Sequence, residues 1–504
     1  MANTLYDALF KPHEASEATF LRLKDGSTVS YAGFLALSAR FAHAMAEAGI
    51  TPGDRVALQA RKSVEALAVY AAAVRMGAVF LPLNTAYTAA EVDYFVSDAG
   101  AKLLICDSAS EAALRSVADK AGAVLMTLSG DGSGTLKDRA QGKPATFAPA
   151  ERGPDDLAAF LYTSGTTGRS KGAMLTHDNL LSNAEALVDT WRFTKDDVLL
   201  HALPIFHTHG LFVATNVILL AGGSAVFLPG LDLDDLVANM PVATTMMGVP
   251  TFYTRLLADP RLTHELVAHM RLFVSGSAPL LAETHRDFEA RTGKRILERY
   301  GMTETNMNTS NPYEGERRAG TVGQPLPGVS VRIADPDTGK PVAAGGIGVI
   351  EVKGRNVFKG YWNMPEKTAQ EFRVDGYFIT GDLATQDADG YVTIVGRAKD
   401  LIIAGGYNIY PKEIELLLDE IPGVEESAVV GVPHPDLGEG VVGIVTARKG
   451  TTLDEATLLA GLSTKLARFK QPRRIFVVDE LPRNTMGKVQ KNLLRERFAG
   501  TFKG

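Results

Sequence analysis

The sequence of 504 residues has very little cysteine and no export signal. Cys106 is the only thiol, which excludes a disulfide within the chain and fits a reducing compartment. It lies in the strand-like segment KLLICD, so we interpret it as a buried, inert side chain. The first ten residues, MANTLYDALF, lack a charged segment followed by an apolar one, and they predict no secretory signal. These absences favour a cytoplasmic protein.

Long hydrophobic runs and clusters of one charge sign are also absent. The most apolar window, residues 213–229, is interrupted by Thr215, Asn216 and a glycine pair, and it predicts a buried helix, a turn and a strand rather than a membrane span. The chain carries 52 Lys and Arg against 58 Asp and Glu, a net charge of -6, without a basic tail or polybasic cluster. This balance argues against nucleic acid or an anionic membrane as a partner. No tail or coiled coil marks a protein partner.

From residue 28 onward, short apolar runs alternate with longer amphipathic segments. Residues 55–60 predict a strand, which an alanine-rich helix and a second strand follow. Thr88 and Glu91 form a capping box at the start of the next helix, and Gly100 marks its end. This alternation is typical of a parallel sheet with crossover helices and predicts an α/β fold.

The sequence pattern changes after about residue 320. There, segments rich in Gly, Pro and Asp separate short strand-like runs, which predicts a β-rich subdomain. Beyond residue 400, helix-like and strand-like segments predict a small α+β domain. The junction GRAKDLIIAGG is charged and then glycine-rich, as hinges are. We therefore predict an N-terminal domain over residues 1–396, a hinge over 397–401 and a C-terminal lid domain over 402–504.

A glycine-rich stretch, TSGTTGRSKG, spans residues 163–172. Glycines let successive backbone N–H groups converge on an anion, while hydroxyls and a lysine add donors and charge. The stretch therefore predicts binding of a nucleotide triphosphate by Thr163, Ser164, Gly165, Thr166, Thr167, Gly168 and Lys171. Its spacing differs from the P-loop of Walker-type NTPases, which disfavours that class. A flexible surface loop has the same composition and is the alternative at this point.

Six further motifs follow in order: SGSAPL (275–280), YGMTE (300–304), YFITGD (377–382), GRAKDLI (396–402), GGYNIYPKEIE (405–415) and NTMGKVQK (484–491). With the glycine-rich stretch, they resemble the adenylate-forming superfamily of acyl-CoA synthetases, nonribosomal-peptide adenylation domains and firefly-type luciferases. The resemblance covers essentially the whole chain. It implies a large N-terminal domain hinged to a small lid. It also implies a two-step reaction, in which a carboxylate attacks the ATP α-phosphorus and releases pyrophosphate, and a thiol then displaces AMP.

The resemblance also implies roles for individual residues. Lys488 would supply the positive charge for adenylation, Thr303 would contact the α-phosphate, and Glu304 with Thr163 would hold Mg²⁺. The remaining nucleotide-site residues implied by the resemblance are Ser277, Ala278, Tyr300, Gly301, Met302, Asp382 and Arg397. Without the motifs, Lys488 would be interpreted as a solvated lysine, Tyr300 as core and Asp382 as a turn residue.

The resemblance places Lys399 at the hinge and Gly405 with Gly406 along the path of the pantetheine arm of coenzyme A. Many relatives have a lysine two residues before the glycine pair, where this chain has Ile403. That departure removes one expected polar contact and leaves the hinge interpretation unchanged.

The segment SGSAPLLAETHRDFEART bears on which carboxylate is used. A short dicarboxylate needs a cation at its far end, because an unpaired buried charge is costly. A helix after Pro279 places Arg286 on the flank of its apolar stripe, although such an arginine is more often solvated. The sequence looks most like bacterial malonyl-CoA synthetases, which implies that Arg286 binds the second carboxylate and that His207 and Ser277 lie near the substrate. His207 and His209 lack a third ligand and make a weak metal signal.

The sequence thus predicts an ATP-, Mg²⁺- and coenzyme A-dependent ligase that forms malonyl-CoA. The alternatives are another short-chain or aryl acyl-CoA synthetase, an adenylation enzyme that loads a carrier-protein thiol, and a nucleotide-binding protein without activity. The joint presence of Lys171, Glu304, Asp382 and Lys488 argues against the last. Acylation of Lys488 would remove its charge, so we predict that this modification silences the enzyme.

Overall fold

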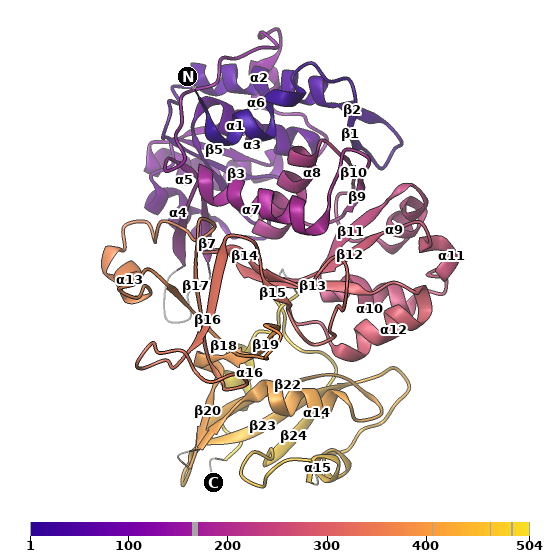
Figure 1. The fold of residues 1–504 in the computed structure, drawn as a ribbon. Coiled ribbons are helices and arrows are strands. Elements are labelled where there is room, and N and C mark those ends of the chain that lie inside the picture. Colours follow the sequence, from indigo (N-terminus) through magenta and orange to yellow (C-terminus); the bar gives the residue numbers. More distant parts are fainter. Residues whose placement is uncertain (1, 164–169, 406, 464, 485–486, 503–504) are drawn as a thin grey trace.

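The computed structural model describes residues 2–163, 170–405, 407–463, 465–484 and 487–502, without the side chain of Asn408. The N-terminal part of the chain forms the upper body in Figure 1, and the C-terminal part forms a separate layer below it. The expected α/β class, with a large N-terminal part and a small C-terminal domain, is confirmed. Within the described residues, no helix is both long and apolar enough to cross a membrane.

The first sheet carries the glycine-rich stretch at one edge. Its strand order is β6-β5-β3-β4-β7-β8, with parallel neighbours except for the antiparallel pair β7 and β8. The predicted capping box between Thr88 and Glu91 is present, and Gly100 ends that helix with φ of 59°. The elements are β3 (Arg55–Gln59), α3 (Val64–Met76), β4 (Val79–Pro82), α4 (Ala89–Ala99), β5 (Leu103–Cys106), α5 (Glu111–Ala121), β6 (Val124–Thr127), α6 (Thr135–Ala140), β7 (Leu157–Thr163) and β8 (Lys171–Thr176).

The second sheet has nine strands in the order β15-β14-β13-β12-β11-β9-β10-β1-β2. Strands β9, β11, β12 and β13 are parallel, so the loops at their C-terminal ends meet at one edge. The strands are β1 (Thr19–Arg22), β2 (Thr28–Ser30), β9 (Val198–His201), β10 (Ser224–Phe227), β11 (Thr245–Gly248), β12 (Leu272–Ser275), β13 (Ile296–Met302), β14 (Asn306–Ser310) and β15 (Gln324–Pro325).

Helices cover both sheets and bury an extensive apolar core. They include α1 (Thr4–Leu9), α2 (Tyr31–Glu47), α7 (His177–Trp191), α8 (Asn216–Ala221), α9 (Leu233–Asn239), α10 (Pro250–Ala258), α11 (His264–Val267), α12 (Ala282–Thr292) and α13 (Pro365–Gln370). Cys106 lies in this buried interior, as expected.

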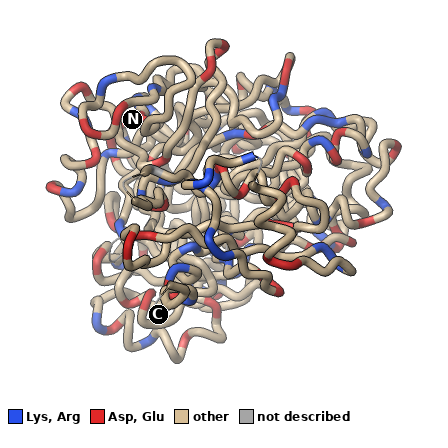
Figure 2. The backbone as a smooth tube through the Cα atoms, turned by 90° about the horizontal axis from the view of Figure 1, so that it is seen from below, with Lys and Arg blue, Asp and Glu red and all other residues tan. Residues whose placement is uncertain are grey.

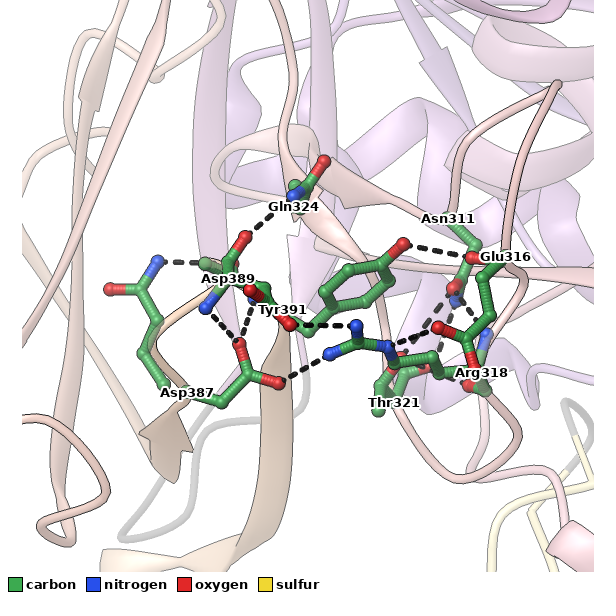
Figure 3. Close-up of polar contacts among 10 residues, drawn as sticks. Asn311, Glu316, Arg318, Thr321, Gln324, Asp387, Asp389 and Tyr391 are labelled. Atoms are coloured by element: carbon green, nitrogen blue, oxygen red, sulfur yellow. Dashed lines mark hydrogen bonds and ion pairs between the residues drawn. The ribbon is translucent and has the colours of Figure 1, made fainter.

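A four-stranded antiparallel sheet forms the predicted β-rich subdomain, in the order β16 (Val329–Ala334), β17 (Gly348–Gly354), β18 (Phe378–Gln386) and β19 (Val392–Arg397). Figure 3 shows how Arg318 attaches the loop after β14 to the turn between β18 and β19. Its guanidinium donates to Asp387 Oδ2 at 2.8 Å and to Asp389 Oδ2 at 2.7 Å, and it lies 4.0 Å from the Tyr391 ring centroid. These contacts link the subdomain to the second sheet.

The C-terminal domain has its own five-stranded sheet and two small apolar clusters. The boundaries 1–396, 397–401 and 402–504 stay predictions. Lys and Arg are interspersed with Asp and Glu in Figure 2, which views the molecule from below. The elements are β20 (Ile402–Ala404), β21 (Tyr407–Ile409), α14 (Pro411–Asp419), β22 (Val424–His434), β23 (Gly438–Ala447), α15 (Glu455–Ser463), β24 (Arg474–Val478) and α16 (Lys491–Phe498).

Asp419, at the end of α14, makes the stability of this domain depend on pH. Burial raises the pKa of this carboxyl group to about 6, and it outweighs the opposing effects of the Lys412 charge and of Ser427. A raised acid pKa means that the folded state binds the proton more tightly, so the stabilisation is complete below about pH 4 and is lost as the pH rises through 6. The shift of about two pKa units corresponds to about 3 kcal/mol.

We expect Asp419→Asn to raise the free energy of unfolding at pH 8, because it removes a buried negative charge. The gain relative to the unmodified protein should shrink toward zero at pH 4. Urea unfolding of both proteins at a series of pH values measures the free energy of unfolding at pH 8 and at pH 4. Asp436→Asn, at an exposed site, is the matched control and should show no such trend. A pH-independent difference for Asp419→Asn would contradict the expectation.

Candidate active site

The two ends of the glycine-rich stretch face each other on neighbouring strands. Thr163 ends β7, Lys171 begins β8, and the two residues are paired directly across the antiparallel ladder. Ser164, Gly165, Thr166, Thr167 and Gly168 lie outside the described residues. The sheet therefore presents Thr163 and Lys171 side by side at the predicted phosphate site.

Lys171 is connected to Glu304 through residues that are distant in sequence. Its ammonium lies 3.0 Å from Glu371 Oε1 and 3.9 Å from the centroid of the Tyr361 ring. Tyr361 Oη in turn lies 2.7 Å from Glu371 Oε2 and 3.0 Å from Glu304 Oε1. Glu304 is buried, and burial raises its pKa. The structure thus brings the lysine and the carboxylate, predicted for phosphate and Mg²⁺ respectively, into one network.

A second network joins Tyr300, Asp382 and Arg397. Tyr300 Oη donates a hydrogen bond of 2.5 Å to Asp382 Oδ2, and Arg397 Nε lies 2.8 Å from Asp382 Oδ1. Asp382 is buried on β18, and Arg397 ends the adjacent strand β19. The three residues predicted for adenine and ribose are therefore neighbours.

Two turns place backbone close to these networks. Gly301 lies at an irregular position in the pairing of β13 with β14, where a Cβ would meet Asn306 O at 1.9 Å, so only glycine fits. Met302 and Thr303 follow it and are half-buried. Ser277 follows β12 with φ of 69°, an unusual value for a residue with a side chain, and Ala278 comes next. Backbone strain of this kind often marks a functional loop.

Arg299 is the buried cation of the site. It lies on β13 immediately before Tyr300, and its side chain packs against Gly276, where a Cβ would lie 2.4 Å from the guanidinium carbon. Nε and Nη2 have no hydrogen-bond partner among the described residues. Burial lowers the pKa of Arg299 to about 9, which leaves it positively charged at neutral pH. A buried cation with free donors is a site for an anion.

Neutral histidines lie within electrostatic range of Arg299. Burial is the largest influence on His207, lowering its pKa to about 3, and it lowers the pKa of His209 well below the usual value; the Arg299 charge acts in the same direction on both. His207 Nδ1 accepts from the His209 backbone N–H at 3.4 Å, so its proton lies on Nε2. Ser277 Oγ lies 3.2 Å from His209 Nδ1. No group of three or more metal-ligating side chains occurs in the described ranges.

The arginine predicted to bind the second carboxylate lies at the surface of the structure, and its role stays a prediction. Arg286 is exposed on α12, whereas His285 and Phe288 form the buried side of that helix. The predicted apolar stripe is present, but it turns Arg286 toward solvent. Arg299 supplies a buried guanidinium near His207.

Lys488 reaches the same region from the C-terminal domain. The charges of Arg397, Asp382, Glu304 and Lys399 all act on it, and its pKa is lowered, mainly by desolvation. Lys488 is nevertheless exposed by its accessible surface, so water reaches the side chain. Lys399 is exposed, Gly405 has φ of 58° just after β20, and Gly406 lies outside the described residues.

The family profile described as AMP-binding enzyme matches residues 11–362, and that described as AMP-binding enzyme C-terminal domain matches residues 413–488. The chain belongs to the AMP-binding enzyme family.

Relatives of this AMP-binding enzyme include proteins with different named substrates. It is 38% identical over 497 residues to a feruloyl-CoA synthase of Amycolatopsis, covering 97% of each chain. It is 36% identical over 483 residues to a malonate–CoA ligase of Arabidopsis thaliana, covering 89% of this chain and 78% of the relative. The identities to these two relatives alone therefore do not select the carboxylate.

Among solved structures, the AMP-binding enzyme is similar to MatB from Rhodopseudomonas palustris, with 59% identity and all of both chains covered. The TM-score is 0.98 to the ATP-bound crystal structure and 0.86 to the apo crystal structure. Identity and coverage are equal in the two comparisons. The arrangement described here thus resembles the ATP-bound relative more closely than the apo form.

Sequence reasoning missed Arg299, Tyr361 and Glu371 in this AMP-binding enzyme. The sequence did contain an indication of Arg299: it lies inside the strand-like run ILERYGM, and an arginine is rarely buried in a strand without a partner. Glu371 had none, since it meets Lys171 across 200 positions. Tyr361 likewise reaches Glu304 only through the tertiary fold.

Proposed function

We propose that the chain is an ATP- and coenzyme A-dependent ligase that forms malonyl-CoA through malonyl-adenylate. The observation that carries this proposal is Arg299, a buried cation with free donors beside the predicted nucleotide residues. The malonate–CoA ligase relative and the site motifs support the same reaction.

A dicarboxylate fits Arg299 better than a monocarboxylate does. One carboxylate must react at the ATP α-phosphorus, and the second would remain charged in a closed site. Arg299 Nε and Nη2 would donate to this second carboxylate, and neutral His207 would offer its Nε2 proton. A feruloyl group, by contrast, would leave the buried guanidinium without an anionic partner.

In the first step, the carboxylate of malonate forms a bond to the α-phosphorus and pyrophosphate leaves. Lys488 would stabilise the negative charge that develops between these two anions. Lys171 would bind the phosphates, and Thr303 would contact the α-phosphate. Tyr300, Asp382 and Arg397 would hold the adenosine, with Gly301, Met302, Ser277 and Ala278 forming the adjoining backbone walls.

The residues at Glu304 fit a Mg²⁺ ion that the nucleotide brings with it. Magnesium at nucleotide sites takes one or two protein oxygens and receives most other ligands from phosphate and water. Glu304 supplies a buried carboxylate, and Thr163 supplies a hydroxyl at the end of β7. When bound, the ion would neutralise phosphate charge.

In the second step, the coenzyme A thiolate attacks the acyl carbonyl and AMP leaves. We propose that backbone rotation at residues 397–401, around Lys399, moves the lid between the two steps. Gly405 and Gly406 would then lie along the pantetheine arm. Acylation of Lys488 would block the first step, because it removes the positive charge.

The direct test is AMP release from ATP, Mg²⁺ and coenzyme A with malonate, acetate, octanoate or ferulate supplied separately. Strong preference for malonate is the expected result. Preference for ferulate would instead favour the aryl acyl-CoA synthetase suggested by the 38% identical relative. Adenylation of malonate followed by transfer to a carrier-protein thiol, but not to coenzyme A, would replace the proposed acceptor.

A further inference from the structure

An ion pair joins the C-terminal domain to helix α12. Arg448, which follows β23, places Nη2 at 2.9 Å from Glu283 Oε1 and 2.8 Å from Glu283 Oε2. Among the residues that the structure describes, no other ion pair joins residues 402–502 to residues 2–396. It therefore records one particular placement of the lid.

Both partners are held by their own domains. Arg448 Nε donates to Val424 O at 3.0 Å, which fixes the base of the side chain against β22. Glu283 lies in the first turn of α12, whose opposite side carries the buried residues His285 and Phe288. Because each partner is attached to a rigid element, the pair transmits a restraint from α12 to the lid sheet.

Packing between the lid and the N-terminal part is incomplete at another place. A cavity of about 310 Å³ lies between β19 and α14, lined by Ile394, Leu416 and Lys412 among others. Leu416 is 40% exposed, so its side chain is not fully enclosed by the facing strand. Polar contacts such as that of Arg448 therefore have a larger share in setting the lid position than they would in a close-packed interface.

The placement held by this pair is also the one that inserts Lys488. Gly487 lies against α10, where a Cβ would be 3.8 Å from Thr251 Cγ2. Lys488, the next residue, is within electrostatic range of Glu304 and Asp382. The overall arrangement gives a TM-score of 0.98 to ATP-bound MatB and 0.86 to apo MatB, a difference between those two comparisons.

We infer that Arg448 and Glu283 are positioning residues for the adenylation step: their ion pair holds the lid where Lys488 enters the site, and it must break before the thioester step. This inference rests on the proposed two-step function. It assigns neither residue a contact with substrate. The ion pair would therefore favour the adenylation half-reaction and would not be needed for the thioester-forming half-reaction.

The test measures the two half-reactions separately. Glu283→Gln and Arg448→Met should each slow malonate-dependent exchange of pyrophosphate into ATP by about two- to fivefold, the range set by half-exposed ion pairs. Formation of malonyl-CoA from supplied malonyl-AMP and coenzyme A should stay unchanged or accelerate. The exchanged pair Glu283→Arg with Arg448→Glu should recover the exchange rate, and added NaCl should slow the unmodified enzyme more than either single variant.

Glu289 and Arg295 provide a matched control. Their ion pair has a 2.6 Å separation and similar exposure, and it involves the same helix, but both residues belong to the N-terminal part. Glu289→Gln and Arg295→Met should leave both half-reactions unchanged. Equal loss of both half-reactions in the Glu283 and Arg448 variants, or no recovery in the exchanged pair, would overturn the inference. If malonate supports no exchange in the unmodified enzyme, the proposed substrate is wrong, and the pair is tested with the carboxylate that does support it.

Discussion

Arg299→Ala is expected to reduce kcat/KM for malonate by about 100- to 1,000-fold while leaving the KM for ATP nearly unchanged. Removing one partner of a buried ion pair costs about 3 to 4 kcal/mol at the lower end of its usual range, because the other charge stays buried without compensation, and each 1.4 kcal/mol is a factor of ten. ATP is proposed to bind through other residues, so the KM for ATP should not change. Steady-state kinetics with each substrate varied in turn measures both effects.

Arg286→Ala is the matched control for this prediction. Arg286 is exposed on α12, and its removal should leave malonate kinetics unchanged. The two variants therefore show which arginine binds malonate: Arg286, which the sequence predicts, or Arg299, which is buried in the structure. Loss of malonate use in Arg286→Ala, with little effect of Arg299→Ala, would contradict the assignment of Arg299.

Lys488→Ala is expected to slow adenylation by about 100- to 1,000-fold, the usual effect of removing one group that stabilises transition-state charge. Conversion of supplied malonyl-AMP and coenzyme A to malonyl-CoA should continue, because Lys488 is proposed to act only in the first step. Pyrophosphate exchange and single-turnover thioester formation measure the two steps independently. Equal loss of both would contradict this division.

Stoichiometric acetylation of Lys488 should reproduce the alanine phenotype, since an acetyl group removes the charge and keeps most of the side chain. Lys465→Ala is the matched control, because Lys465 is an exposed lid lysine paired with Glu420. Full adenylation activity after complete acetylation of Lys488 would show that its charge is not required.

The sequence predicted well where local patterns decide the structure. The capping box at Thr88 and Glu91 formed as expected, because it depends on residues three positions apart. The apolar stripe containing His285 and Phe288 was also predicted correctly. Periodicity shows which side of a helix is buried, but it does not show which arginine faces a pocket.

Arg299 could not be identified as a second candidate without the sheet. Pairing of β12 with β13 places Arg299 against Gly276, and only that pairing reveals an arginine enclosed by two strands. The connection from Lys171 through Glu371 to Tyr361 likewise exists only after β8 and the segment near α13 pack together. Such contacts leave no short-range pattern in the sequence.

Asp382 contacts two residues that are predicted to act in different parts of the reaction cycle. Tyr300, predicted to face the base, donates to one oxygen, and Arg397, the first residue of the predicted hinge, lies at the other. Coupling free energy is reciprocal, so a ligand that competes for Asp382 alters the freedom of Arg397 by as much as Arg397 alters the affinity for that ligand. With the proposed roles of Asp382 and Arg397, this carboxylate would couple nucleotide binding to the conformation of the hinge.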